Sequence, residues 1–170
     1  MSNLTLIAPF QTLSLNEVAG QFYTHKATFT MNDCNAVPSA TTATQIWNLP
    51  LLGTGWVVLG AAIYVQTPFV FSNASIVIGE LQVGDGSAIT TYFATAASQP
   101  IQGTGATSSV AAGACYVTNT TVAYPVSTNA QLQFKMTITT GQAFNTATAG
   151  EVDFYFRAVN LAQLSYPLSN

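Results

Sequence analysis

Residues 55–92 read GWVVLGAAIYVQTPFVFSNASIVIGELQVGDGSAITTY, and this stretch decides the fold that the sequence predicts. Residues 57–65 alternate at period two, as a strand does when one of its faces lies in a core. Residues 75–83 alternate again after Thr67-Pro68, where we expect the first strand to end because proline has no amide hydrogen to give to a sheet. The expected inward residues are Val57, Leu59, Ala61, Ile63 and Val65 in the first strand and Val77, Leu81 and Val83 in the second.

The turn that follows the second strand is the strongest local signal in the chain. Residues 84–87 read Gly-Asp-Gly-Ser, and Asp-Gly favours a tight hairpin because both residues tolerate positive φ. Residues 88–94 then provide the returning strand. Two core strands and a return are therefore predicted, and none of them carries a group with evident chemistry.

The composition points to one folded domain with a nearly uncharged surface. The chain has 170 residues, of which 5% are charged, 49% hydrophobic and 11% aromatic, whereas ordinary globular proteins are about 25% charged. Its only cations are Lys26, Lys135 and Arg157, and the net charge is -3. These groups cannot neutralise a run of phosphates, so we expect no nucleic-acid partner.

Targeting and redox signals are weak. The N-terminus, MSNLTLIAPF, lacks the basic region and small-residue cleavage pattern of a secretory signal. Residues 46–65 are uncharged and long enough for a bilayer, but Pro50 and several glycines divide them into turn-sized pieces, so no membrane association is expected. Cys34 and Cys115 are expected to be free thiols in a reducing compartment, although a disulfide between them stays open.

Further segments with strand periodicity are separated by turn residues. They are residues 26–31, 42–47, 116–124, 131–139 and 151–159. Together with the three segments above they make about eight short strands, a pattern typical of an all-β antiparallel sandwich. The long connections favour a jelly roll over an immunoglobulin-like sandwich.

The domain organisation follows from the same pattern. Residues 1–24 have scattered apolar side chains without a sustained period and are predicted to form an N-terminal arm or irregular segment. Residues 25–170 are predicted to form the jelly-roll β-sandwich domain. Residues 96–113 are mostly small and are expected to form a long surface loop.

The last two predicted strands carry the clearest alternation. The expected inward residues are Leu132, Phe134, Met136 and Ile138 in one strand and Val152, Phe154, Phe156 and Ala158 in the other. If these strands form a hairpin, Lys135 and Arg157 lie on the same face as Glu151 and Asp153. The sequence then predicts a surface ion-pair cluster of Lys135, Glu151, Asp153 and Arg157.

Candidate chemical groups are few. His25 is the only histidine, and we expect it at the surface at the start of a strand. Glu151 and Asp153 could form the paired carboxylates of a glycosidase, but their strand also carries Arg157, which favours ion pairing. Asp85 fits a turn better than a calcium site, and no phosphate loop, dinucleotide fingerprint or zinc spacing occurs. The sequence therefore predicts no catalytic residue, metal site or cofactor.

Residues 55–69, GWVVLGAAIYVQTPF, and residues 76–93, IVIGELQVGDGSAITTYF, resemble the jelly-roll domains of tailed-bacteriophage structural proteins. In that family a V-x-x-G-x-x-V strand is followed by a V-G-D-G-S turn and an aromatic residue. Its members include capsid decoration (cement) proteins, head fibres and tail-tip proteins. The resemblance implies a homotrimer, and for decoration members a position on the capsid exterior that bridges neighbouring capsid subunits.

For this chain the resemblance implies a virion protein that is assembled in the host cytoplasm and has the major capsid protein as partner. Leu4, Ile7, Phe10 and Leu13 of the arm are the candidates for capsid binding. The alternative is a receptor- or glycan-binding module at a tail tip or in a fibre, with Tyr92, Tyr124, Tyr155 and Tyr166 as the aromatic residues to test. A long fibre is less favoured, because the sequence has no triple-helical or collagen-like repeat.

Overall fold

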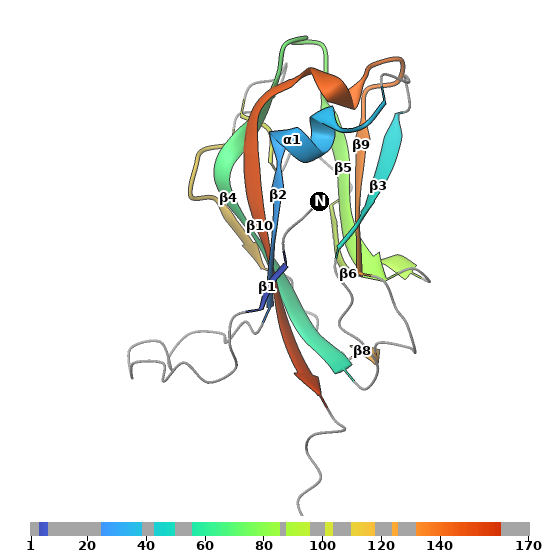
Figure 1. The fold of residues 1–170 in the computed structure, drawn as a ribbon, viewed down its shortest axis with the longest axis vertical. Coiled ribbons are helices and arrows are strands. Elements are labelled where there is room, and N and C mark those ends of the chain that lie inside the picture. Colours follow the sequence, from blue (N-terminus) through green and yellow to red (C-terminus); the bar gives the residue numbers. More distant parts are fainter. Residues whose placement is uncertain are drawn as a thin grey trace, which may run out of the picture.

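The computed structural model describes residues 4–6, 25–38, 43–49, 56–85, 88–95, 101–103, 110–117, 124–125 and 132–160. Nearly all of its elements are strands (Figure 1). The elements are β1 (Leu4–Leu6), β2 (His25–Thr30), α1 (Met31–Asn35), β3 (Thr44–Asn48), β4 (Trp56–Phe71), β5 (Ile78–Asp85), β6 (Ala88–Thr95), β7 (Cys115–Val117), β8 (Tyr124–Pro125), β9 (Leu132–Ile138), the 3-10 turn η1 (Phe144–Thr146) and β10 (Ala147–Asn160).

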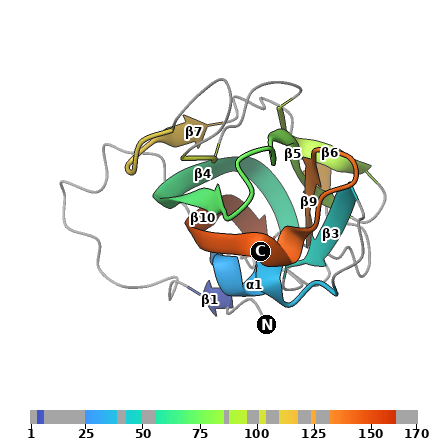
Figure 2. The same ribbon diagram turned by 90° about the horizontal axis from the view of Figure 1, so that it is seen from above.

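The strands form two antiparallel sheets. The six-stranded sheet has the order β1-β2-β10-β4-β7, with β8 also paired to β4, and the four-stranded sheet has the order β3-β9-β5-β6. Seen from above, β10 and β4 lie on one side of the molecule and β3, β9, β5 and β6 on the other (Figure 2). The predicted all-β antiparallel sandwich is confirmed.

The core lies between the sheets and is rich in aromatic rings. Phe29, Phe134 and Phe154 are each no more than 1% exposed. Phe134 joins the two sheets, because its ring centroid is 4.8 Å from that of Phe29 and 4.7 Å from that of Phe154. All eight side chains predicted to point inward from residues 131–139 and 151–159 are buried. Each large apolar side chain buried in this way contributes about 1.5–3 kcal/mol.

Strand β4 differs from the prediction, because it runs through Pro68 instead of ending there. Pro68 and Phe69 lie between Thr67, which pairs with Glu151, and Val70, which pairs with Ala149. The register shifts at this β-bulge, so the ladder needs no amide hydrogen from Pro68. The prediction was wrong because a bulge tolerates proline where regular pairing does not.

A second bulge changes the inward set of β4. Gly60 pairs with Arg157 and Val58 with Ala158, so Leu59 is an extra residue on β4. The alternation therefore shifts by one position, and Val58 is 1% exposed whereas Leu59 is only half-buried. Ala61, Ile63 and Val65 are buried, as predicted.

Strand β5 shows the same effect on a smaller scale. Its register against β9 shifts between Ile78 and Glu80, so that Ile78 is fully buried and Val77, predicted to point inward, is half-buried. Leu81 and Val83 are buried, as predicted. The predicted hairpin is confirmed, because β5 pairs with β6 and Asp85 lies opposite Ala88.

Two local features were not predicted. Residues 31–35 form the one-turn helix α1, where the amide of Thr30 donates to Asp33 Oδ2 at 2.8 Å. Within the loop predicted for residues 96–113, Ile101 and Gln102 are buried. Gln102 donates from Nε2 to Ile76 O at 2.6 Å and accepts from the amide of Ile78 at 2.8 Å, so it is a core residue and not a surface residue.

Candidate functional site

The predicted ion-pair cluster is divided between the two sheets. Strands β9 and β10 do not form a hairpin: β9 pairs with β3 and β5, whereas β10 pairs with β2 and β4. The 3-10 turn η1 precedes β10 and carries the chain across from one sheet to the other. Lys135 therefore lies on the outer face of the four-stranded sheet, while Glu151, Asp153 and Arg157 belong to the six-stranded sheet.

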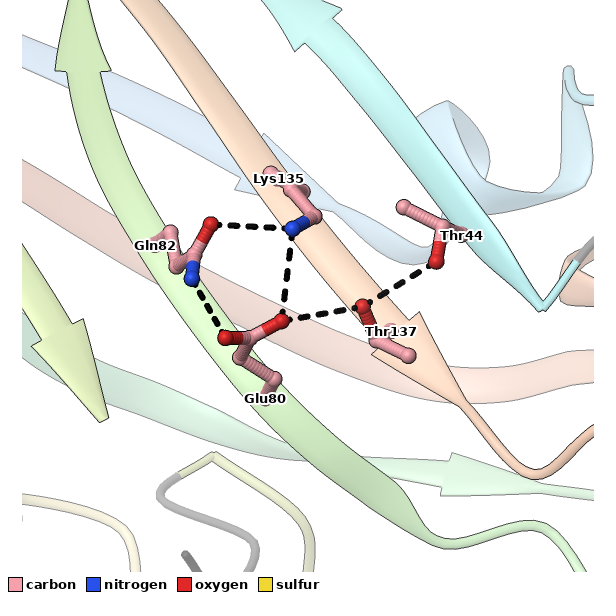
Figure 3. A network of polar contacts seen from close by, with 5 residues as sticks. All are labelled: Thr44, Glu80, Gln82, Lys135 and Thr137. Carbon is pink, nitrogen blue, oxygen red and sulfur yellow. Dashed lines mark hydrogen bonds and ion pairs between the residues drawn. The ribbon is translucent and has the colours of Figure 1, made fainter. Parts of the chain in front are cut away.

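Lys135 has its own carboxylate partner, which lies on β5. Its Nζ is 3.3 Å from Glu80 Oε2 and donates to Gln82 Oε1 at 3.0 Å. Gln82 in turn donates to Glu80 Oε1, and Thr137 donates to Glu80 Oε2 at 3.4 Å. Thr44 continues the network onto β3 through a contact of 3.2 Å with Thr137 (Figure 3). The charge of Lys135 is thus matched within one sheet.

The second network is centred on Asp153 and joins β2, β4 and β10. Lys26 Nζ is 2.8 Å from Asp153 Oδ2, Thr28 donates to Oδ1 at 2.7 Å, and Gln66 donates to Oδ2 at 2.8 Å. The Tyr155 hydroxyl is 3.5 Å from Oδ2. Asp153 is 0% exposed although it faces away from the core, because these longer side chains cover it. The predicted surface location of this carboxylate is therefore wrong.

The environment of Asp153 favours the carboxylate form. Burial by itself would raise the pKa of Asp153, but hydrogen bonds from Gln66, Lys26 and Thr28 and the charge of Lys26 outweigh it, and the pKa is lowered. Arg157 is not part of this network: its Nη2 donates to Leu59 O at 3.4 Å. Glu151 is half-buried two positions before Asp153 on β10.

An apolar hollow of about 270 Å³ lies beside the Asp153 network. It is lined by Ala62, Tyr64, Cys115 and Tyr155. Strand pairing brings these residues together, since Tyr64 lies opposite both Cys115 and Asp153, and Ala62 lies opposite Tyr155. Only Tyr155 was a candidate from the sequence. The other three could not be identified as lining residues from the sequence, because no local pattern shows that β4 pairs with β7.

The remaining candidates are described only in part. Leu4 lies in β1 opposite Ala27 of β2, whereas Ile7, Phe10 and Leu13 lie outside the described residues. Tyr92 lies in β6 and Tyr124 in β8, and Tyr166 is outside the described residues.

The two cysteines are free and have different environments. Cys34 is buried in the core, and Cys115 is exposed beside the hollow. Burial, with a smaller effect of the Asp33 charge, raises the pKa of the Cys34 thiol strongly, and a thiol is much less reactive than a thiolate.

We therefore expect an aromatic disulfide reagent to label one thiol per folded chain quickly at pH 8, because Cys34 is protonated and inaccessible. The second thiol should react only when denaturant unfolds the protein, and Cys115→Ser should remove the fast phase. Rapid labelling of two thiols in native buffer would contradict the burial of Cys34.

His25 is buried and not at the surface as predicted. It is 3% exposed and packs edge-on against Trp56, with ring centroids 4.8 Å apart. The alternation of β2 places it on the inward side with Ala27 and Phe29. Burial lowers the pKa of His25, since the charged imidazolium is poorly solvated there.

The lowered pKa predicts acid sensitivity below neutral pH. The unfolded chain binds a proton at His25 more readily than the folded chain, so stability is complete above about pH 6.5 and falls as the pH decreases below that value. Urea unfolding should show a loss of stability between pH 7.5 and pH 5.5 that does not exceed about 1.4 kcal/mol, the limit that linkage sets for one histidine over this range. His25→Phe keeps a ring against Trp56 and should flatten this dependence; an unchanged pH slope in that variant would contradict the assignment.

The protein is thus an all-β antiparallel sandwich. It has two polar networks on its outer faces and an apolar hollow beside one of them. In the described part of the chain, no group of three or more His, Cys, Asp or Glu side chains is placed to hold a metal ion. None of the helices described is long and apolar enough to cross a bilayer. Comparison with known proteins found no matching family model, no similar curated protein and no similar solved structure.

Proposed function

We propose that the protein is a virion structural protein of the capsid decoration type, which forms trimers and stabilises a phage head by bridging neighbouring capsid subunits. The observation that carries the proposal is that each sheet has one lysine paired with a carboxylate. Lys26 pairs with Asp153 and Lys135 pairs with Glu80. Lysines that already have carboxylate partners can be covered by another protein without the cost of burying an unpaired charge. The resemblance of residues 55–93 to phage jelly-roll proteins supports the same function.

The capsid-binding element of this proposal is the N-terminal arm. Pairing of Leu4–Leu6 with β2 attaches the start of the arm to one edge of the six-stranded sheet. Apolar side chains of the arm bury area on the capsid at about 25 cal/mol per Å². A trimer carries three arms, and binding by the first raises the effective concentration of the other two.

The test is co-sedimentation of purified protein with heads that lack it. Deleting residues 1–20 would also remove β1, so the better variant is Ile7→Ser/Phe10→Ser/Leu13→Ser, which leaves β1 intact. It should bind heads at least about tenfold more weakly, and Gln11→Ala/Thr12→Ala should bind like the wild type. Full decoration by the triple variant would overturn the role of the arm.

A second candidate function, receptor or glycan binding at a tail tip, is favoured by the hollow between Tyr64 and Tyr155. Aromatic side chains beside polar groups are a common lining for small-molecule sites. Binding to a glycan array should then be lost in Tyr155→Ala and kept in Tyr155→Phe.

Gel densitometry of purified particles separates the two functions, because decoration requires a copy number comparable with that of the capsid subunit, and a tail tip requires only a few copies.

A further inference from the structure

In the described part of the chain, no strand pairs with the outer edge of β3. β3 is one of the two end strands of the four-stranded sheet, the other being β6, and lies at its outer side in both views (Figures 1 and 2). The amide of Leu49 donates to Leu132 O at 2.7 Å, and the amide of Ile138 donates to Ala43 O at 2.8 Å. Backbone groups of an antiparallel pair alternate in direction. Those of Thr44, Ile46 and Asn48 therefore point away from β9.

This edge lacks the features that usually prevent strand addition. β3 reads TQIWN, without a charge or a proline, and its five residues make a strand of ordinary length. The described end strands of the other sheet, β1 and β7, have three residues each. Ile46 is 45% exposed, and among the side chains whose burial the structure describes it is the most exposed large hydrophobic one.

The side chains around the edge are already ordered on their own sheet. Thr44 contacts Thr137 at 3.2 Å, and Gln133 donates to Asn48 Oδ1 at 3.1 Å. Lys135, which lies opposite Ile46 in the register of β9, is bound to Glu80 and Gln82 (Figure 3). A strand added to β3 therefore meets an uncharged row with Ile46 at its centre. Gln45 Nε2 donates to Ile46 O at 3.0 Å, and this side chain must rotate away when a strand is added.

We propose that β3 pairs with β3 of a second copy, antiparallel and about a two-fold axis at Ile46. Ile46 of one copy then faces Ile46 of the other, and Thr44 faces Asn48, so no charge meets a like charge. The nearest cations, the two Lys135 side chains, are separated by three strand spacings, about 14 Å, which is beyond the screening length at physiological salt. Because β3 can pair with itself in this way, the partner that we propose for this edge is a second copy of the same chain.

The contact goes beyond the proposed function. A two-fold axis at β3 is separate from any three-fold axis, so it joins two trimers if the protein forms trimers and joins two monomers if it does not. In either case the assembly contains an even number of chains.

Sedimentation equilibrium of the full chain tests the contact. The wild type should sediment as an even multiple of the 17.9 kDa chain. Ile46→Lys places two like charges opposite each other and should weaken the two-fold association at least about tenfold, halving the assembly. Ala74→Lys, which adds the same charge at an exposed position outside the strands, should keep the wild-type mass. A monomer, an odd number of chains, or an Ile46→Lys variant that assembles like the wild type would overturn the proposal.

Amide hydrogen exchange on the wild type gives a readout that does not depend on a variant folding. The amides of Thr44, Ile46 and Asn48 should become protected as the protein concentration rises, because they donate only across the two-fold axis. Rapid exchange at all concentrations would overturn the proposal. So would protection that persists at dilutions where sedimentation shows the two-fold assembly to be dissociated, because a segment of the same chain would then cover the edge.

Discussion

Gly150→Ala is expected to lower the free energy of unfolding by about 4 kcal/mol, the sum of a strained backbone and an overpacked core. Gly150 has a φ of 148°, where L side chains are rarely found. It lies in the bulge between β10 and β4, and a Cβ there would overlap the ring of Phe69. That ring is 0% exposed, so it has no solvent space into which to move. Urea unfolding at 25 °C measures the loss.

Substitutions at two other glycines distinguish the cost of backbone strain from the cost of overpacking. Gly141 has a φ of 79°, but a Cβ added there would meet nothing within 4 Å, so Gly141→Ala should cost only the backbone strain, about 1 kcal/mol. Gly79 has neither a positive φ nor a neighbour within 4 Å of an added Cβ, and Gly79→Ala should be neutral or slightly stabilising. If Gly150→Ala unfolds at the same urea concentration as Gly79→Ala, the close approach to Phe69 is wrong.

Regular alternation predicted the inward residues wherever the strands pair without interruption. In β9 every second side chain from Leu132 to Ile138 is buried, because period-two spacing alone selects that face. The same reasoning failed at Leu59 and Val77, each of which lies next to a register shift. A bulge depends on both strands of a pair, and one strand's sequence does not contain that information.

Side chains that contact distant parts of the chain also could not be predicted from local sequence patterns. His25 was expected at an exposed strand end, but Trp56 packs against it from β4. Gln102 lay in a segment of small residues, yet it bonds to the backbone of Ile76 and Ile78. The prediction that β9 and β10 form a hairpin was wrong for a related reason, since strands that follow each other in the sequence of a sandwich can belong to different sheets. The ion pairs therefore formed with Lys26 and Glu80 instead of within the predicted cluster.

The Asp153 network owes its geometry to such a bulge. Val152 pairs with Val65 and Glu151 with Thr67, which leaves Gln66 as an extra residue on β4. Gln66 donates to Asp153 from one side, while Lys26 and Thr28 reach it from β2 on the other. A carboxylate with three donors, one of them a cation, is stabilised in its charged form even when it is covered.

Asp153→Asn is therefore expected to cost about 3 kcal/mol, because it removes the charge that Lys26 needs and replaces one of the two accepting oxygens with an amide donor. Glu80→Gln removes the other ion pair, in which the Glu80 side chain is 32% and Lys135 23% exposed, and should cost less than about 1 kcal/mol.

The pH dependence of stability provides a second measurement. The pKa of Asp153 is lower in the folded chain than in the unfolded chain, so its contribution is complete above about pH 5 and is lost as the pH falls through the folded pKa. Asp153→Asn should thus lose less stability than the wild type between pH 5 and pH 3. Equal losses in Asp153→Asn and Glu80→Gln at pH 7, with unchanged acid sensitivity, would show that the covered carboxylate contributes no more than an exposed one.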